Sequence, residues 1–206
     1  MIICESLYAD YDDKHVISRL HDATFRANYG TVYGVVLTGV AMVNDRLVLG
    51  GEYFVAVAPS IIKSFGVTAI FNRKDWVGRQ IVGGAIDPDM GDVRYIDGCT
   101  DSLLVAPHRL GDPCLNALYF PPNTDQTFHT HPSIRLGCVL AGSGVACVGD
   151  TGEEIQLRVG TVFGIATDER HRFRTEGKSM LVVAYHPDSD WGPTDEIHPM
   201  INRTIV

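Results

Sequence analysis

Two histidines one residue apart, His129 and His131, are the side chains in this sequence best suited to chemistry. In an extended strand alternate side chains point to the same face, so both imidazoles would lie on one wall. Two neutral imidazoles on one rigid wall are the start of a transition-metal site. A third ligand is available at His171, which follows an apolar strand and opens another. These residues predict a metal centre bound through neutral imidazole nitrogens.

The spacing around these histidines resembles the cupin family. The first cupin motif is a Gly, then HxH, three or four residues, usually Glu, then six residues and a Gly. The second is a Gly, a strand, a turn and a His. The sequence matches these motifs over roughly residues 85–192, at His129, His131, Gly142, Gly160 and His171. The resemblance implies an all-β fold of double-stranded β-helix (jelly-roll) barrels.

The same spacing places Arg135 where the family's Glu would stand. A guanidinium cannot ligate a metal, but it offers a planar fork for a carboxylate, enolate or phosphate. If Arg135 faces the cavity, it would anchor an anionic substrate that also touches the metal. If Pro132 changes the phase of the strand, Arg135 would instead be an ordinary surface residue. Tyr119 and Gln126 flank the motif and are further candidates for the cavity wall.

Three hypotheses follow from the resemblance. Three-His cupin sites are similar to those of certain non-haem iron dioxygenases, so the first is an Fe(II) dioxygenase acting on a small anionic organic molecule. In it, His129, His131 and His171 bind the metal, with Arg135 as substrate anchor. The second is a lyase or isomerase of a small carboxylate or sugar that uses Zn(II), Mn(II) or Ni(II). The third is a non-enzymatic cupin that binds a small molecule.

Composition and charge limit which partners and which cellular compartment are expected. The net charge of −8 over 206 residues argues against nucleic acid or an anionic membrane as a partner. The longest apolar stretch, residues 35–43, is about half of what a membrane span needs. Residues 1–4 have no basic region of the signal-peptide type. Five cysteines without a CxxC spacing predict reduced thiols and a cytoplasmic location.

The order of the elements favours an all-β protein. Residues 12–24 are the best helical candidate, with His15 and His21 at exposed positions. From residue 29 onward, short apolar runs alternate with tight Gly, Asn-Asp and Pro breaks. Strands at this density, without intervening helices, favour a sandwich or barrel over βαβ units.

The Pro-punctuated C-terminal tail leaves two possibilities open. Trp191 and Met200 are the expected anchors of the tail to the barrel. If the tail folds over the barrel mouth, His186 or His198 would serve as a substitute ligand or proton carrier. Otherwise both histidines only pack with the tail.

The strands form two similar series. Residues 35–43 align with 138–148 and pair Gly39 with Gly142. At offsets of 103, 109 and 115 residues, the matched pairs are Gly39 and Gly142, Phe54 and Phe163, and Trp76 and Trp191. The chain therefore resembles a bicupin, with a degenerate half at 1–84 and a metal-binding half with a tail at 85–206.

Carrying the metal ligands back to the first series gives Arg26, Asn28 and Ile62, of which only Asn could bind a metal. The first half would therefore be a barrel without a metal site. Family behaviour implies a homodimer, because cupin-like barrels commonly pair through their sheets.

Overall fold

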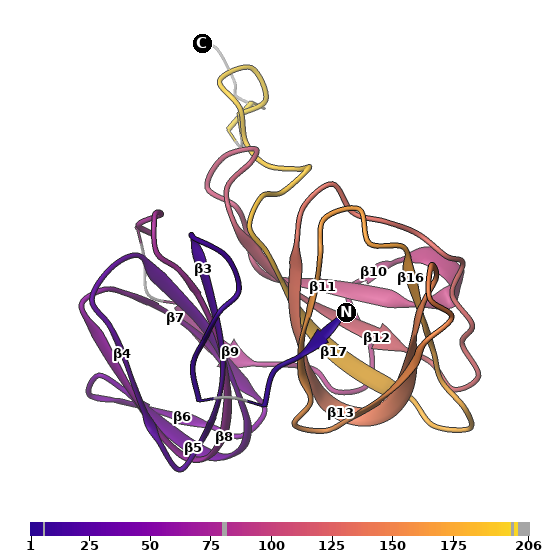
Figure 1. The fold of residues 1–206 in the computed structure, drawn as a ribbon. Helices are drawn as coiled ribbons and strands as arrows, with labels where there is room; N and C mark the ends of the chain where they lie inside the picture. Colours follow the sequence, from indigo (N-terminus) through magenta and orange to yellow (C-terminus); the bar gives the residue numbers. More distant parts are fainter. Residues whose placement is uncertain (6, 80–81, 199, 202–206) are drawn as a thin grey trace.

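The computed structural model describes residues 1–5, 7–79, 82–198 and 200–201, which form two β-sheets that lie side by side (Figure 1). The N-terminal sheet has eight strands in the order β2-β3-β8-β5-β7-β9, with β4 paired to β8 and β6 to β5. Its strands are β2 (Ala9–Asp10), β3 (His15–His21), β4 (Thr24–Ala27), β5 (Thr31–Val43), β6 (Arg46–Leu49), β7 (Glu52–Val57), β8 (Ser60–Arg73) and β9 (Val82–Ala85).

The C-terminal sheet has nine strands in the order β1-β15-β13-β17-β12-β11-β10, with β14 and β16 paired to β13. Its strands are β1 (Ile2–Ile3), β10 (Val93–Arg94), β11 (Thr100–Val105), β12 (Cys114–Phe120), β13 (Arg135–Val148), β14 (Glu154–Arg158), β15 (Val162–Ile165), β16 (His171–Arg174) and β17 (Met180–His186). A 3₁₀ turn, η1 (Ile96–Gly98), precedes β11. The predicted all-β class is confirmed.

The helix expected over residues 12–24 is wrong, because β3 and β4 lie there. Both faces of β3 are buried: Leu20 points into the core of the N-terminal half and Ile17 into a core shared by the two halves. A strand buried on both faces lacks the alternation of polar and apolar residues, so its sequence can imitate a helical stripe. His15, expected to be exposed, is buried with its Nδ1 2.9 Å from Asp12 Oδ1, whereas His21 is exposed.

Three apolar cores hold the molecule together. One fills the N-terminal half, around Phe25, Val32 and Ile70. A second fills the C-terminal half, around Phe120 and Phe163. The third lies between the halves and includes residues of both sheets, among them Tyr33, Phe71 and Tyr185. Because burial of apolar area dominates stability, this shared core joins the two sheets into one structure.

The two long strands follow the same path in both halves. Each carries a register shift at the corresponding place, centred on Leu37 in β5 and on Leu140 in β13. The glycine two residues further on has a positive φ in both, 74° at Gly39 and 70° at Gly142. The offset between the corresponding residues is 103, as expected from the sequence.

The N-terminal sheet ends with β9 at Ala85, and its strands come before those of the C-terminal sheet in the sequence. One exception is β1, which pairs with β15 of the C-terminal sheet. All five cysteines are buried. None of the described residues belongs to a helix long and apolar enough to cross a membrane.

Candidate metal centre

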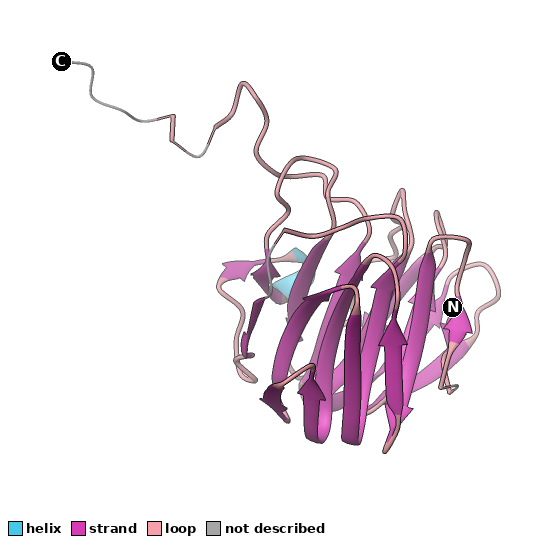
Figure 2. Ribbon diagram, turned by 90° about the vertical axis from the view of Figure 1, so that its left-hand side faces the viewer, coloured by secondary structure: helices cyan, strands magenta, loops and turns pink. Residues whose placement is uncertain are grey.

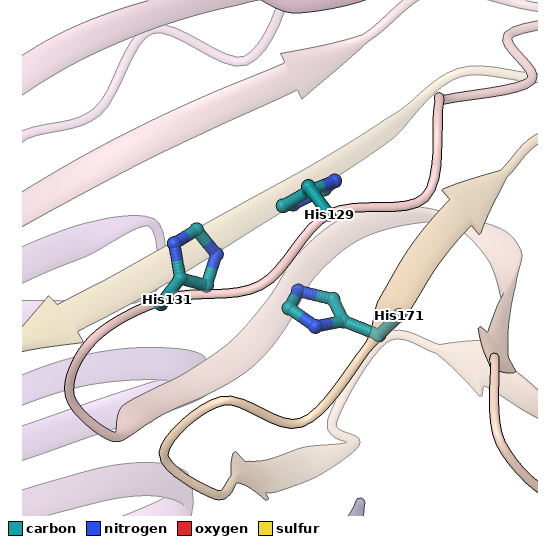
Figure 3. Close-up of side chains that lie close together, drawn as sticks. All are labelled: His129, His131 and His171. Atoms are coloured by element: carbon teal, nitrogen blue, oxygen red, sulfur yellow. The ribbon is translucent and has the colours of Figure 1, made fainter.

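His129 and His171 face each other across two antiparallel segments. Their backbones exchange two hydrogen bonds, each 3.0 Å long. His131 follows two residues later, and its carbonyl accepts a 2.8 Å hydrogen bond from the amide of Asp168. Because alternate residues of an extended segment share a face, the three rings gather around one point (Figure 3).

The segment that carries His129 and His131 is held on both sides. Asp97 of η1 accepts hydrogen bonds from the amide and hydroxyl of Thr127, at 2.7 and 3.1 Å. On the other side, the guanidinium carbons of Arg170 and Arg172 lie 4.3 and 4.7 Å from the ring centre of Phe128. Such cation–π contacts stabilise the outward position of Phe128. The alternate residues are thereby directed inward.

The ring centres of His129, His131 and His171 lie 4.6 to 5.1 Å apart, and one ring nitrogen from each lies within 4.8 Å of the others. Nδ1 of His129 bonds to the carbonyl of Thr127 at 2.9 Å, and Nδ1 of His171 to that of Glu169 at 2.7 Å. Carbonyl acceptors hold the proton on Nδ1, so the lone pair is on Nε2. Nε2 of His171 is buried, with no hydrogen-bond partner among the described residues.

Burial keeps two of these rings neutral. Desolvation, followed by the charge of Arg135, lowers the pKa of His131 to about 3. Desolvation also lowers the pKa of His171 to about 4. Convergent neutral imidazoles are the donors that Fe(II), Zn(II), Mn(II) and Ni(II) accept. The donor set therefore fits one divalent transition metal.

The three histidines line one wall of a cavity of about 50 Å³ inside the C-terminal half. Most of the other lining side chains are apolar: Leu118, Phe120, Leu136, Phe163, Ile165, Phe173, Val182 and Ala184. The polar ones, besides the histidine triad, are Tyr95, Gln126, Arg135 and His186. Apolar walls with a few placed polar groups are typical of sites for small organic ligands.

Arg135 lies in the wall of this cavity and is only 6% exposed. Its Nη1 donates to the carbonyl of Ser133 at 3.1 Å, to the Ser133 hydroxyl at 2.5 Å and to the carbonyl of Ile134 at 2.9 Å. Its Nε is buried and has no partner in the described part of the chain. Burial lowers the pKa of the guanidinium, but arginine stays protonated in proteins. One donor edge of a buried cation is therefore available to an anion.

The central part of this half also matches a known family. Residues 118–186 fit the family model described as the cupin domain. This part of the chain is similar to a cupin domain. No curated protein matches the chain.

Solved structures with the same fold extend over both halves. A cupin 2 conserved barrel domain protein from Leptotrichia buccalis has 16% identity and a TM-score of 0.61, covering 88% of this chain and 87% of that one. The putative glyoxylate induced protein from Pseudomonas aeruginosa has 13% identity and a TM-score of 0.60, covering 90% and 79%. Salicylate 1,2-dioxygenase from Pseudoaminobacter salicylatoxidans, solved with gentisate, has 11% identity and a TM-score of 0.56, covering 84% and 68%. These likenesses show the fold.

Of the two residues that flank the motif, the structure brings only Gln126 into the cupin cavity. Its Oε1 accepts from the amide of Phe173 at 3.3 Å and its Nε2 lies 3.6 Å from Cys99 Sγ, so its polar atoms hold the wall together. Tyr119, which was expected in the cavity wall, does not line this cavity. Its neighbours on β12 line the cavity, and since side chains alternate along a strand, Tyr119 points the other way and packs against the shared core.

The two tail histidines have different places. His186, the last residue of β17, lines the cupin cavity, whereas His198 is exposed. The expected anchoring of the tail is wrong, because Trp191 is 64% exposed and Met200 is 71% exposed. Figure 2 shows the tail leading away from the sheets instead of folding over them.

Sequence reasoning missed Tyr95 in the cavity wall, and the Ser133 and Asp188 side chains that lie behind Arg135. The Ser133 hydroxyl donates to Asp188 Oδ1. No spacing rule connects residues 55 positions apart, so only the fold could reveal this pair.

Proposed function

We propose that the protein is a metal-dependent cupin enzyme, most simply an Fe(II) dioxygenase, that acts on a small organic carboxylate. One observation carries the proposal. A three-imidazole donor set and a buried guanidinium with a free donor edge line the same apolar cavity. A ligand that is anionic at one end and apolar in its body would complete both groups.

Each residue then has a defined task. His129, His131 and His171 would hold one divalent metal, which supplies open positions for a substrate and, if it is Fe(II), for dioxygen. Thr127 and Glu169 hold two of the rings by their backbone carbonyls. Arg135 would bind the substrate carboxylate by its Nε and Nη2 edge, since its hydrogen bonds to Ser133 and Ile134 engage only Nη1. The phenylalanine walls exclude water from the substrate.

The similar structures guide the first assays. One of them is a salicylate 1,2-dioxygenase solved with gentisate, so small aromatic carboxylates are the natural starting substrates. The five buried cysteines and the lack of a CxxC spacing support a reducing compartment, and we place the protein in the cytoplasm. The shared register of β5 and β13 supports the interpretation of the chain as a bicupin whose first half lacks the metal.

Metal content tests the proposal. Protein purified without added metal is subjected to elemental analysis as wild type, as the His129→Ala/His131→Ala double variant and as His21→Ala, an exposed histidine outside the site. We expect about one equivalent of iron in wild type and His21→Ala and almost none in the double variant, because removing ligands removes the site.

Oxygen uptake follows on the same samples. Consumption of dioxygen with an aromatic carboxylate, lost in the double variant and kept in His21→Ala, would support the dioxygenase. One equivalent of zinc, manganese or nickel would overturn the dioxygenase and leave a lyase or isomerase. No metal in the wild type, even after reconstitution, would overturn the metal centre altogether.

A further inference from the structure

Arg135 is the near end of a chain of hydrogen bonds that leaves the cavity. Its Nη1 donates to the carbonyl and to the hydroxyl of Ser133. The Ser133 hydroxyl has one proton, and it donates that proton to the carboxylate of Asp188. Because the hydroxyl proton points to Asp188, the Ser133 oxygen can accept a hydrogen bond from the guanidinium. The direction of this chain depends on where Asp188 lies.

The loop that carries Asp188 is fixed by the other half of the molecule. Arg73, at the end of β8, donates through Nη1 to the carbonyl of Pro187. The same guanidinium donates through Nε to Asp75 at 2.9 Å, and Lys14 Nζ lies 3.3 Å from that carboxylate. Pro187 and Asp188 are adjacent in the chain, so a contact made by the N-terminal half sets the place of a carboxylate behind the cavity.

These contacts run along one boundary. A cleft of about 240 Å³ between the halves is lined by Lys14, His15 and Arg73 from the first half and by Ser133 and Asp188 from the second. The cupin cavity lies beyond Ser133, where Arg135 forms part of its wall. The cleft is polar and open to solvent at its rim, whereas the cavity is apolar. The hydrogen-bonded chain through Ser133 connects the cleft with the cavity wall.

We propose that Arg73 is a positioning residue for the substrate anchor: through Pro187, Asp188 and Ser133 it holds the guanidinium of Arg135 with its Nε and Nη2 edge toward the cavity. The inference rests on the proposed function, in which that edge binds the substrate carboxylate. It gives the half without metal ligands a task in catalysis, because that half supplies the fixed end of the chain.

The size of the effect follows from preorganisation. A side-on guanidinium binds a carboxylate by two parallel hydrogen bonds only if the fork is held in the correct orientation. Loss of the Arg73 bond frees the 187–188 loop, and ordering must then be supplied on binding. We expect carboxylate affinity to fall roughly ten-fold, which corresponds to about 1.4 kcal/mol.

The test follows the Nε–H of Arg135 itself. Protein labelled with ¹⁵N-arginine and loaded with zinc is titrated with sodium acetate, against sodium chloride at equal ionic strength, and the arginine Nε–H signals are recorded by NMR. The Arg135 signal is identified by its loss in Arg135→Met. Wild type should show a saturable shift of this signal with acetate. In Arg73→Met and Asp188→Ala the acetate concentration at half-saturation should rise about ten-fold, with zinc content unchanged.

Two further variants make the result specific. Arg19→Met is the matched control, because Arg19 also crosses between the halves, donating to the carbonyl of Gly160 at 2.8 Å, but makes none of the hydrogen bonds that lead to Arg135. It should leave acetate binding unchanged. Arg73→Lys can still donate to Pro187 while losing the Nε hydrogen bond to Asp75, so its acetate affinity should lie between those of wild type and Arg73→Met.

The outcomes separate this inference from the function beneath it. If the Arg135 signal responds to acetate equally in wild type and Arg73→Met, Arg73 does not position the anchor, and the anchor itself stands. If Arg19→Met weakens binding as much as Arg73→Met, a general loosening of the two halves replaces the specific chain. If the Arg135 signal of the wild type does not respond to acetate, Arg135 is not the carboxylate anchor, and both proposals fall at that point.

Discussion

The two sheets repeat several backbone features, whereas the three candidate metal ligands all belong to the C-terminal half. In β5, Gly34 lies against the ring of Phe54, and in β13 Gly137 lies against the ring of Phe163; an added Cβ would meet these rings at 2.0 and 2.6 Å. The glycines are 103 residues apart and the phenylalanines 109, as the sequence pairing predicts. Both sheets therefore repeat three features: a glycine packed against an aromatic ring, a bulge in the long strand, and a glycine with positive φ after it.

The difference lies at the cavity end of the strands. The strand pairing makes Val32 the counterpart of Arg135. Val32 pairs with Ala56 and Arg135 pairs with Ile165, at the same offsets of 103 and 109 residues. Ala27 pairs with Ser60 as His129 pairs with His171. The counterpart of His171 is therefore Ser60.

This register corrects the sequence alignment, which gave Ile62 as the counterpart of His171. Ile62 pairs with Val43, and Phe173 pairs with Ala146, 103 residues after Val43. Ile62 and Phe173 are the matched core residues of the two halves. The lesson is that a few positions at one end of the barrel change from apolar or small to ligating or charged, while the packing below them is kept.

The strongest test of this comparison is to place the charge of one half into the other. Val32 is fully buried among apolar residues, so Val32→Arg would bury an unpaired guanidinium and lower the free energy of unfolding by roughly 3–5 kcal/mol. Arg135 is tolerated at the matching place because the carbonyls of Ser133 and Ile134 accept from it. Urea denaturation measures the difference, with Val32→Leu as the control for size. A Val32→Arg protein within about 1 kcal/mol of wild type would contradict the claim that the two sites differ.

How much of this could be predicted depends on the range of the interaction. The all-β class and the paired glycines follow from local signals, the turn residues and the short apolar runs. The strand at residues 15–21 was mistaken for a helix because its burial on both faces is set by two distant cores, which no local period records. The three histidines could be predicted because their spacing matches the cupin motifs.

The site beyond those histidines needed the fold. Arg135 lies three residues after Pro132, so the sequence left open which side of the strand it faces. The fold places it in the cavity wall, where the carbonyls of Ser133 and Ile134 accept from its Nη1. Tyr119 lies between two large apolar residues of β12 that line the cavity, and it differs from them only in pointing to the other side of the strand. Asp188 reaches Ser133 through a loop 55 residues further along the chain.

A second comparison tests whether both halves depend on the same turn. A Cβ on Gly39 would meet the carbonyl oxygen of Phe65 at 2.1 Å, and one on Gly142 would meet that of Ser179 at 1.9 Å. Each alanine would also sit at positive φ, so both variants should lose roughly 3 kcal/mol of unfolding free energy. Gly177→Ala is the matched control, with φ at 63° and nothing within 4 Å of its Cβ, and should lose only about 1 kcal/mol. Unequal losses at Gly39 and Gly142 in urea denaturation would break the equivalence of the halves.

The reverse exchange should make the protein more stable. Arg135→Met replaces a buried cation, whose Nε has no partner among the described residues, by an apolar side chain like the residue of the other half. The substitution removes the desolvation cost of a cation with an unpaired Nε, so we expect a gain of about 1–2 kcal/mol together with loss of acetate binding. Arg19→Met, in which a carbonyl contact is lost, should give no gain. A net loss of stability in Arg135→Met would show that Arg135 serves the fold more than the site.

The last comparison concerns protons. Burial, followed by the charges of Arg135 and His131, holds the pKa of His186 well below its usual range. Tyr33 pairs with Phe71 as Leu136 pairs with Tyr185, so the residue that corresponds to His186 is Asn72, which does not titrate. The unfolded chain binds a proton at His186 below about pH 6.5 and the folded chain does not, so the stabilising contribution is present above that pH and is lost as the pH falls. One such group changes the unfolding free energy by at most about 1.4 kcal/mol per pH unit. In urea denaturation of metal-free protein at pH 6.5, 6.0 and 5.5, His186→Asn should therefore lose stability less steeply than wild type. His21→Asn, at an exposed histidine, should follow the wild-type slope. If His186→Asn keeps that slope as well, His186 is already protonated in the folded protein, and the cavity is more polar at this end than its lining suggests.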